Sequence, residues 1–197
     1  METRRQGDKQ EDDTLSQAVP CPPVPLPPVP LSPRTFFLPF LASCFGLGYS
    51  PIMPGTCGAL IGPALYIPLA LVVKNEPLQS IGIAALLAVW SWITVALGRW
   101  AEDYYQRKDS QIFVTDEVAG FLLTVLLFHI PSHPILTTLW AFPVTRIIDI
   151  IKVPPAKRLE HLPRGWGVLA DDLLGSVYAA AVLWMIKFIV PGWFPAT

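Results

Sequence analysis

Acidic residues mark the edges of several long apolar runs in this sequence. The pair Asp116-Glu117, the single Asp149 and the pair Asp171-Asp172 each lie at such an edge. A carboxylate against hydrocarbon is costly unless it is paired, so acids in these positions are candidates for function. Oxygen ligands without a Cys or His cluster suit Mg²⁺, which usually also binds a phosphate of the substrate. The sequence therefore predicts a Mg²⁺ site whose candidate ligands are Asp116, Glu117, Asp149, Asp171 and Asp172.

Two basic residues flank Asp149 at a spacing of three, Arg146 before it and Lys152 after it. Arg presents a planar fork of donors to a phosphate, and Lys presents a point charge. We therefore expect Arg146 and Lys152 to bind the substrate phosphate. The alternative is that both form ion pairs with Asp149 on one face of a helix.

Residues 51–58 read PIMPGTCG and are expected to end a loop and open a helix. Gly55 and Thr56 would then offer backbone N–H groups and a hydroxyl to a bound anion. A plain helix cap is the alternative. Gly165-Trp166-Gly167, ahead of Asp171, similarly predicts either a simple turn or a backbone that approaches a ligand closely.

Both acidic pairs are expected to begin helices, where carboxylates complement the helix dipole and cap free N–H groups. This structural explanation accounts for either pair alone. It does not cover Asp149, which is expected near the C-terminal end of its helix, where the dipole disfavours an anion. Convergence on a cation accounts for all five acids together.

The composition predicts a membrane protein, since 52% of the residues are hydrophobic, only 15% are charged and the mean hydropathy is +0.47. The basic residues are too few and too scattered for nucleic-acid binding. Uncharged or nearly uncharged runs cover residues 57–73, 77–98, 118–145 and 173–190. Pro131 and Pro134 should split the third run into a hairpin of helices, 117–130 and 134–151. We expect an all-α bundle of about five spans, with the shorter run 36–48 as a re-entrant or interfacial segment.

Residues 1–34 are expected to form a disordered tail, polar at first and then rich in proline, ahead of a membrane domain over residues 35–197. The tail lacks the apolar helix of a secretory signal. The three cysteines have no metal-ligand spacing, and Cys44 and Cys57 are interpreted as packed thiols.

The order of the spans predicts where the acids meet. If the run 57–73 crosses outward, the run 77–98 returns and the hairpin crosses and returns again, so all five acids and Gly55-Thr56 lie on one face. Most basic residues of the domain, Arg146 and Lys152 included, lie on that same face, which the positive-inside rule makes cytoplasmic.

Four motifs resemble the phosphatidylglycerophosphatase A family of bacterial membrane enzymes. They are SPIMPGTCGAL (50–60), VTDEVAG (114–120), TRIIDIIKVPP (145–155) and GWGVLADDLLGSVYA (165–179). The resemblance implies Mg²⁺-dependent hydrolysis of phosphatidylglycerophosphate to phosphatidylglycerol and phosphate at a bacterial inner membrane. Thr115, Val153 and Trp166 depart from the family's usual residues, and none of these departures removes a candidate ligand.

The expected chemistry is in-line attack by a water that Asp171 or Asp172 orients at the metal, with Asp149 also catalytic. One alternative is an ion- or proton-coupled transporter, in which buried acids line a pathway. A transporter should place its acids near the midplane, whereas here they are predicted at one face. Another alternative is a non-catalytic scaffold that uses the proline-rich tail.

Overall fold

The computed structural model describes residues 33–105, 112–151 and 165–194, and every element in these ranges is helical. The α-helices are α2 (Pro33–Ala42), α3 (Pro54–Ala59), α4 (Ile61–Val72), α5 (Glu76–Tyr105), α6 (Thr115–Leu127), α7 (Pro134–Ile151) and α9 (Gly165–Ile189). Short 3₁₀ turns cover Leu47–Tyr49 and Pro191–Trp193. The predicted all-α architecture is confirmed. The expected tail lies outside the described residues, apart from Pro33 and Arg34 at the start of α2.

Four helices of the described residues are long and apolar enough to cross a membrane. They are Pro54–Val72, which combines α3 and α4, then Glu76–Tyr104, Pro134–Ile151 and Gly165–Ile189. The fifth expected span, α6, has only 13 residues. Its length of about 20 Å falls short of a hydrocarbon core of about 30 Å. The helix α2, with 10 residues, is also too short to span, as expected for the run 36–48.

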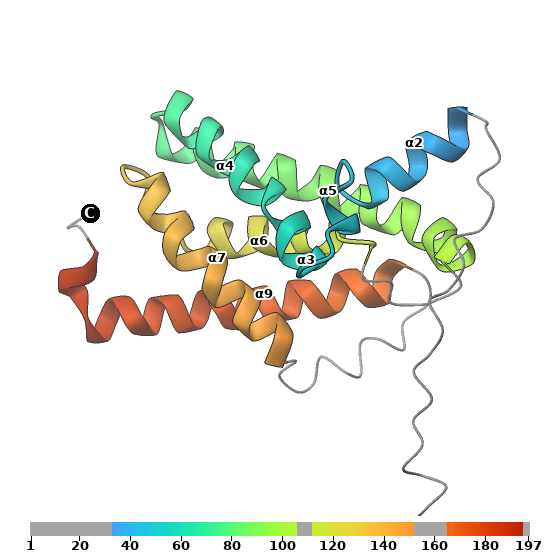
Figure 1. The fold of residues 1–197 in the computed structure, drawn as a ribbon. Helices are drawn as coiled ribbons and strands as arrows, with labels where there is room; N and C mark the ends of the chain where they lie inside the picture. Colours follow the sequence, from blue (N-terminus) through green and yellow to red (C-terminus); the bar gives the residue numbers. More distant parts are fainter. Residues whose placement is uncertain (1–32, 106–111, 152–164, 195–197) are drawn as a thin grey trace, which may run out of the picture. The chain divides into compact units, whose positions relative to one another are not determined.

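The short helix α6 is surrounded by other helices. It contacts α3, α4, α5, α7 and α9, and α5 and α9 lie on opposite sides of it (Figure 1). Most of its residues are buried, and Phe121 packs edge-on against Tyr66 of α4 and Phe142 of α7. A helix covered by protein need not match the bilayer thickness, because its ends do not face lipid.

The predicted split at Pro131 and Pro134 is confirmed, since α6 and α7 are joined by a turn at this point. His129 in the turn lies close enough to Glu76, at the start of α5, for their charges to interact. The α4–α5 turn and the α6–α7 turn therefore lie at the same end of the bundle, as the order of spans predicts. At this end Trp140 stacks on Trp193, with 5.2 Å between the rings.

Two helices extend beyond their apolar runs. The helix α5 continues to Tyr105, because Leu97 and Ala101 on its last turns pack against Ala42 and Phe113. The helix α9 begins at Gly165, and the expectation that Asp171-Asp172 begins a helix is wrong. Both acids lie in its second turn, so capping does not account for them.

The interpretation of Gly165-Trp166-Gly167 as a turn is also wrong, because these residues form the first turn of α9. A Cβ on Gly165 would lie 2.7 Å from the Thr94 carbonyl oxygen and 3.1 Å from Gly98 Cα of α5. The glycine is there because two helix backbones touch, rather than because a ligand approaches.

Candidate active site

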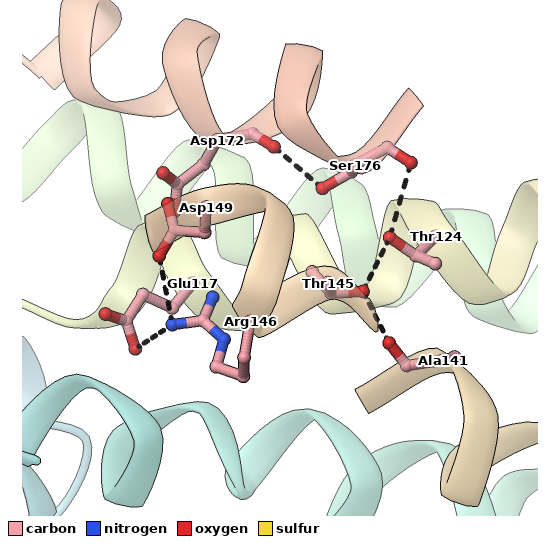
Figure 2. Close-up of polar contacts among 8 residues, drawn as sticks. All are labelled: Glu117, Thr124, Ala141, Thr145, Arg146, Asp149, Asp172 and Ser176. Atoms are coloured by element: carbon pink, nitrogen blue, oxygen red, sulfur yellow. Dashed lines mark hydrogen bonds and ion pairs between the residues drawn. The ribbon is translucent and has the colours of Figure 1, made fainter. Parts of the chain in front are cut away.

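Arg146 joins the acid-bearing helices α6 and α7. Its side chain is only 10% exposed, and its Nη1 atom lies 3.1 Å from Glu117 Oε2 of α6. The same nitrogen lies 3.2 Å from Asp149 Oδ2, one turn further along α7 (Figure 2). The expected ion pair between Arg146 and Asp149 is present, and a second one crosses between helices. Because charged hydrogen bonds are stronger away from water, Arg146 holds the two carboxylates in a fixed relation.

Asp172 brings α9 to the same place. Its carboxylate interacts electrostatically with those of Asp116, Glu117 and Asp149 and with Arg146. Figure 2 shows it directed towards Asp149. Its Oδ2 atom is buried and accepts no hydrogen bond from the described residues. The acids of α6, α7 and α9, distant in sequence, therefore form one cluster.

Gly120 allows α9 to approach α6 closely at this cluster. A Cβ at position 120 would lie 3.7 Å from Asp172 Cβ and 3.0 Å from Ser176 Oγ. A side chain at position 120 would therefore press on the Ser176 hydroxyl, whereas its separation from Asp172 Cβ is an ordinary van der Waals contact.

Among the described residues of this cluster, negative charge exceeds positive charge. Four carboxylates, those of Asp116, Glu117, Asp149 and Asp172, interact there with the guanidinium of Arg146. Like charges held together in a buried place require a bound cation or protons. The donors are all oxygens, which suits a hard divalent ion such as Mg²⁺. Within the described residues, however, no three Asp, Glu, His or Cys side chains already stand in a metal-holding arrangement.

Gly55 of α3 lies directly against this cluster. A Cβ on Gly55 would collide with Glu117 Oε1 and would lie 3.0 Å from Glu117 Cδ. Met53, two residues before Gly55, has a left-handed backbone with φ of 51°, which is unfavourable for a side chain of its kind. Thr56 follows on the same turn and is half-buried. The motif around Gly55 therefore brings a helix start against a site carboxylate, which a plain cap does not require.

The last residue of α2 and the turn that follows it are hydrogen-bonded to the residue before α6. The backbone N–H of Val114 donates to the Ala42 carbonyl at 3.2 Å, and the Cys44 thiol donates to the Val114 carbonyl. Burial, reinforced by the charges of Asp116 and Glu117, raises the pKa of Cys44, so its thiol stays protonated. Cys44 is free and buried, as predicted for a packed thiol.

The buried polar residue at position 115 has a structural explanation. Thr115 is fully buried at the start of α6, and its hydroxyl lies 3.1 Å from the Thr94 hydroxyl of α5. A hydrogen bond between these two hydroxyls gives each buried group a partner where water is excluded.

The remaining predicted residues are placed less directly. Asp171 is buried on α9, and adjacent positions on a helix do not face the same way, so it does not share the direction of Asp172. Lys152 lies outside the described residues. Of the predicted set, the structure thus brings together Asp116, Glu117, Arg146, Asp149, Asp172 and Gly55.

The fold and the cluster together define a polytopic helical membrane protein with a buried site of carboxylates and one arginine. A family model described as Phosphatidylglycerophosphatase A matches residues 40–187, a range that contains every predicted site residue. The chain belongs to the phosphatidylglycerophosphatase A family, and it is therefore a phosphatase, a hydrolase of phosphoric monoesters. The comparisons give no support to the transporter alternative.

Three curated relatives cover most of the chain. A putative phosphatidylinositol-3-phosphatase of Bacteroides thetaiotaomicron is 30% identical over 80% of this chain and 98% of its own length. The phosphatidylglycerophosphatase A of Escherichia coli is 29% identical, over 74% of this chain and 81% of the relative. The phosphatidylglycerophosphatase A of Haemophilus influenzae is 30% identical, over 75% of this chain and 87% of the relative. No solved structure matches the chain.

Proposed function

We propose that this protein is a Mg²⁺-dependent phosphatase that hydrolyses phosphatidylglycerophosphate to phosphatidylglycerol and phosphate. The observation that carries the proposal is the convergence of Glu117, Asp149 and Asp172 around Arg146, inside a chain of this family. Two of the relatives are named for this activity.

The donor set fits a divalent cation. Glu117, Asp149 and Asp172 would hold it, with Asp116 as a ligand or directly behind, and Asp171 as a further candidate from the adjacent position. The buried Asp172 Oδ2, which accepts no hydrogen bond from the described residues, is the acceptor that would gain most from a bound cation. Bound there, Mg²⁺ would offset the charge of the phosphate and make a water molecule more acidic.

Arg146 is proposed to hold the phosphate. Both of its ion pairs to described residues use Nη1, and a guanidinium carries five N–H donors. The donors on its other nitrogens can therefore turn to phosphate oxygens without releasing the carboxylates. Gly55 and Thr56 would contact the phosphate from α3, and Lys152 would add a second positive charge.

The reaction is proposed as in-line attack of water on phosphorus. Asp172 orients the water and accepts its proton, while Asp149 keeps Arg146 aligned with the phosphate. The bond between phosphorus and the ester oxygen breaks, the leaving alkoxide takes a proton from solvent, and Asp172 later returns its proton to solvent. Inorganic phosphate is the other product.

The proposed location is a bacterial inner membrane, with the site at the cytoplasmic face. Among the described residues, Arg99 and Arg146 lie towards the end of the bundle that carries the site, and Lys74 and Lys187 lie towards the other end. Six further basic residues of the sequence fall between α5 and α6 or between α7 and α9, on the side predicted to carry the site: Arg107, Lys108, Lys152, Lys157, Arg158 and Arg164. Positive charge concentrated at one end marks the cytoplasmic side.

The test is phosphate release from phosphatidylglycerophosphate by the purified full chain in detergent micelles, with Mg²⁺ or with a chelator. We expect release only with Mg²⁺. Asp149→Asn should lower turnover by about a hundredfold or more, while Asp103→Asn, an exposed acid on α5, should leave it unchanged. Absence of release under both conditions would contradict the proposal.

A second candidate substrate is suggested by the relative of Bacteroides thetaiotaomicron, which is named for phosphatidylinositol 3-phosphate. Both lipids carry a phosphomonoester beside a membrane surface. The same assay with phosphatidylinositol 3-phosphate compares the two, and the larger kcat/KM identifies the substrate class that the site prefers.

A further inference from the structure

Beneath the carboxylate cluster lies a group of three buried hydroxyls, one on each acid-bearing helix. They belong to Thr124 of α6, Thr145 of α7 and Ser176 of α9, and their residues are 0%, 4% and 0% exposed. None of the three hydroxyls takes part in the proposed reaction.

Their spacing from the site residues is helical. Thr124 follows Glu117 by seven residues, Thr145 precedes Asp149 by four, and Ser176 follows Asp172 by four. Residues four or seven apart lie on the same face of a helix. Each hydroxyl therefore faces the same way as the carboxylate of its own helix, one or two turns deeper in the bundle.

The three residues connect the helices to one another. The hydroxyls of Thr145 and Thr124 are 3.1 Å apart, which joins α7 to α6. Thr124 Oγ1 lies 3.5 Å from the Ser176 carbonyl oxygen, which joins α6 to α9. The Ser176 hydroxyl donates to the Asp172 carbonyl at 2.7 Å, next to the site carboxylate (Figure 2).

These contacts are not needed merely to satisfy buried hydroxyls. Thr145 Oγ1 already lies 2.7 Å from the Ala141 carbonyl of its own helix, and Thr124 Oγ1 lies 3.2 Å from the Gly120 carbonyl. Thr138 of α7 shows this simpler arrangement, with its hydroxyl 2.9 Å from the Pro134 carbonyl. Each hydroxyl has one proton, so it donates either within its own helix or across to another. When Thr145 donates to Thr124 and Thr124 donates to the Ser176 carbonyl, the two protons fix the relative position of three helices.

We propose that Thr124, Thr145 and Ser176 form a hydroxyl clamp that sets the register of α6, α7 and α9 and thereby positions Glu117, Asp149 and Asp172. They are positioning residues, because they lie below the carboxylates and act through them. Side-chain hydrogen bonds between membrane helices are individually weak. Small displacements of catalytic groups nevertheless reduce rates strongly, so the clamp should matter more to turnover than to stability.

The inference rests on the proposed function, since its readout is phosphate release. Thr145→Val keeps the shape of the side chain and removes its hydroxyl, and Thr138→Val is the matched control on the same helix. We expect Thr145→Val to lower kcat about tenfold or more while KM for the lipid and the thermal midpoint remain near those of Thr138→Val. Thr145→Ser, which restores the hydroxyl, should recover most of the lost kcat.

A second pair of variants makes the test independent of how well one valine is tolerated. Thr124→Ala should lower kcat more than Thr124→Ser does, because only the alanine removes the hydroxyl. In the Thr124→Ala/Thr145→Val double variant the losses should not multiply, because both changes break the same contact.

The clamp is overturned if Thr145→Val and Thr138→Val lose equal activity, or if the loss appears in KM with kcat unchanged. It is also overturned if Thr145→Ser fails to recover kcat, or if the Thr124 and Thr145 losses multiply. An inactive wild-type protein contradicts the proposed function itself, whereas an active wild type with a fully active Thr145→Val contradicts the clamp alone.

Discussion

Gly55→Ala should disable the site by displacing a carboxylate. The added Cβ would collide with Glu117 Oε1 and lie 3.0 Å and 3.2 Å from Glu117 Cδ and Oε2. These atoms are the end of a flexible side chain, so we expect the carboxylate to swing away rather than α3 to move. That motion breaks the 3.1 Å ion pair between Glu117 and Arg146.

The loss of stability is limited by the ion pair that Arg146 keeps. Removing one partner from a buried ion pair costs about 3–5 kcal/mol, but Arg146 keeps Asp149 at 3.2 Å. We therefore expect the free energy of unfolding to fall by about 1–3 kcal/mol, the usual range for overpacking. Turnover should fall further, by about a hundredfold, because a site carboxylate is misplaced by about 1 Å or more.

The assay is phosphate release in detergent, paired with thermal unfolding of the same preparation. Gly175→Ala of α9 is the matched control, since its added Cβ meets nothing closer than Ile148 Cγ2 at 3.9 Å. It should retain activity and gain about 0.5–1 kcal/mol from reduced flexibility of the unfolded chain. If Gly55→Ala turns over lipid as fast as Gly175→Ala, the reasoning about Glu117 is wrong.

Three further predictions concern the packing of α5, α6 and α9 and the N-terminal tail. Gly165→Ala should lower the thermal midpoint of unfolding by several degrees, because the added Cβ meets the Gly98 backbone, which cannot rotate away. An unchanged midpoint would contradict the close contact between α5 and α9. Thr94→Val should cost about 0.5–1.5 kcal/mol of unfolding free energy, the range for one hydrogen bond between membrane helices, by leaving the Thr115 hydroxyl without its cross-helix partner. The Thr94→Val/Thr115→Val double variant should recover most of that stability, and equal losses in the single and double variants would contradict the pairing. Deleting residues 1–32, which precede the matched range, should leave turnover unchanged, and a large loss would favour a role for the tail.

The convergence of distant acids was predictable because it depends on counting spans. The apolar runs and Pro131-Pro134 fix the number of reversals between residues 54 and 189. That number alone places Glu117 and Asp149 at the same end of the bundle, where Arg146 joins them. The order of the spans places these residues together even though α6 is too short to cross the bilayer by itself, since a buried helix can reverse the chain without crossing the full bilayer.

The helix limits were less predictable, because packing overrides the apolar pattern. No hydropathy signal marks residues 165–172 as helical, and α9 begins there because Gly165 rests on α5. The same contact places Asp172 in the second turn, where its neighbours come from other helices. A sequence pattern that is purely local does not contain such an interaction.

The roles of Gly55 and of the buried hydroxyls in positioning the site could not be predicted from the sequence. The glycine looks like part of a cap until the Glu117 carboxylate is seen against it. Thr124, Thr145 and Ser176 carried one usable signal, namely a hydroxyl four or seven residues from an acid on the same helix face. Their contacts with one another depend on how three helices cross, which spacing within one helix does not specify.

The packing of α9 against α6 at the carboxylates can be tested directly by a disulfide. A Cβ at position 120 would lie 3.7 Å from Asp172 Cβ, close to the average separation in disulfides. In a background without native cysteines, we expect Gly120→Cys with Asp172→Cys to form an intramolecular cross-link under mild oxidation. Gly120→Cys with Asp171→Cys should not, because adjacent helix positions face different ways. No cross-link at 172, or equal cross-linking at 171, would mean that the acids do not meet as described.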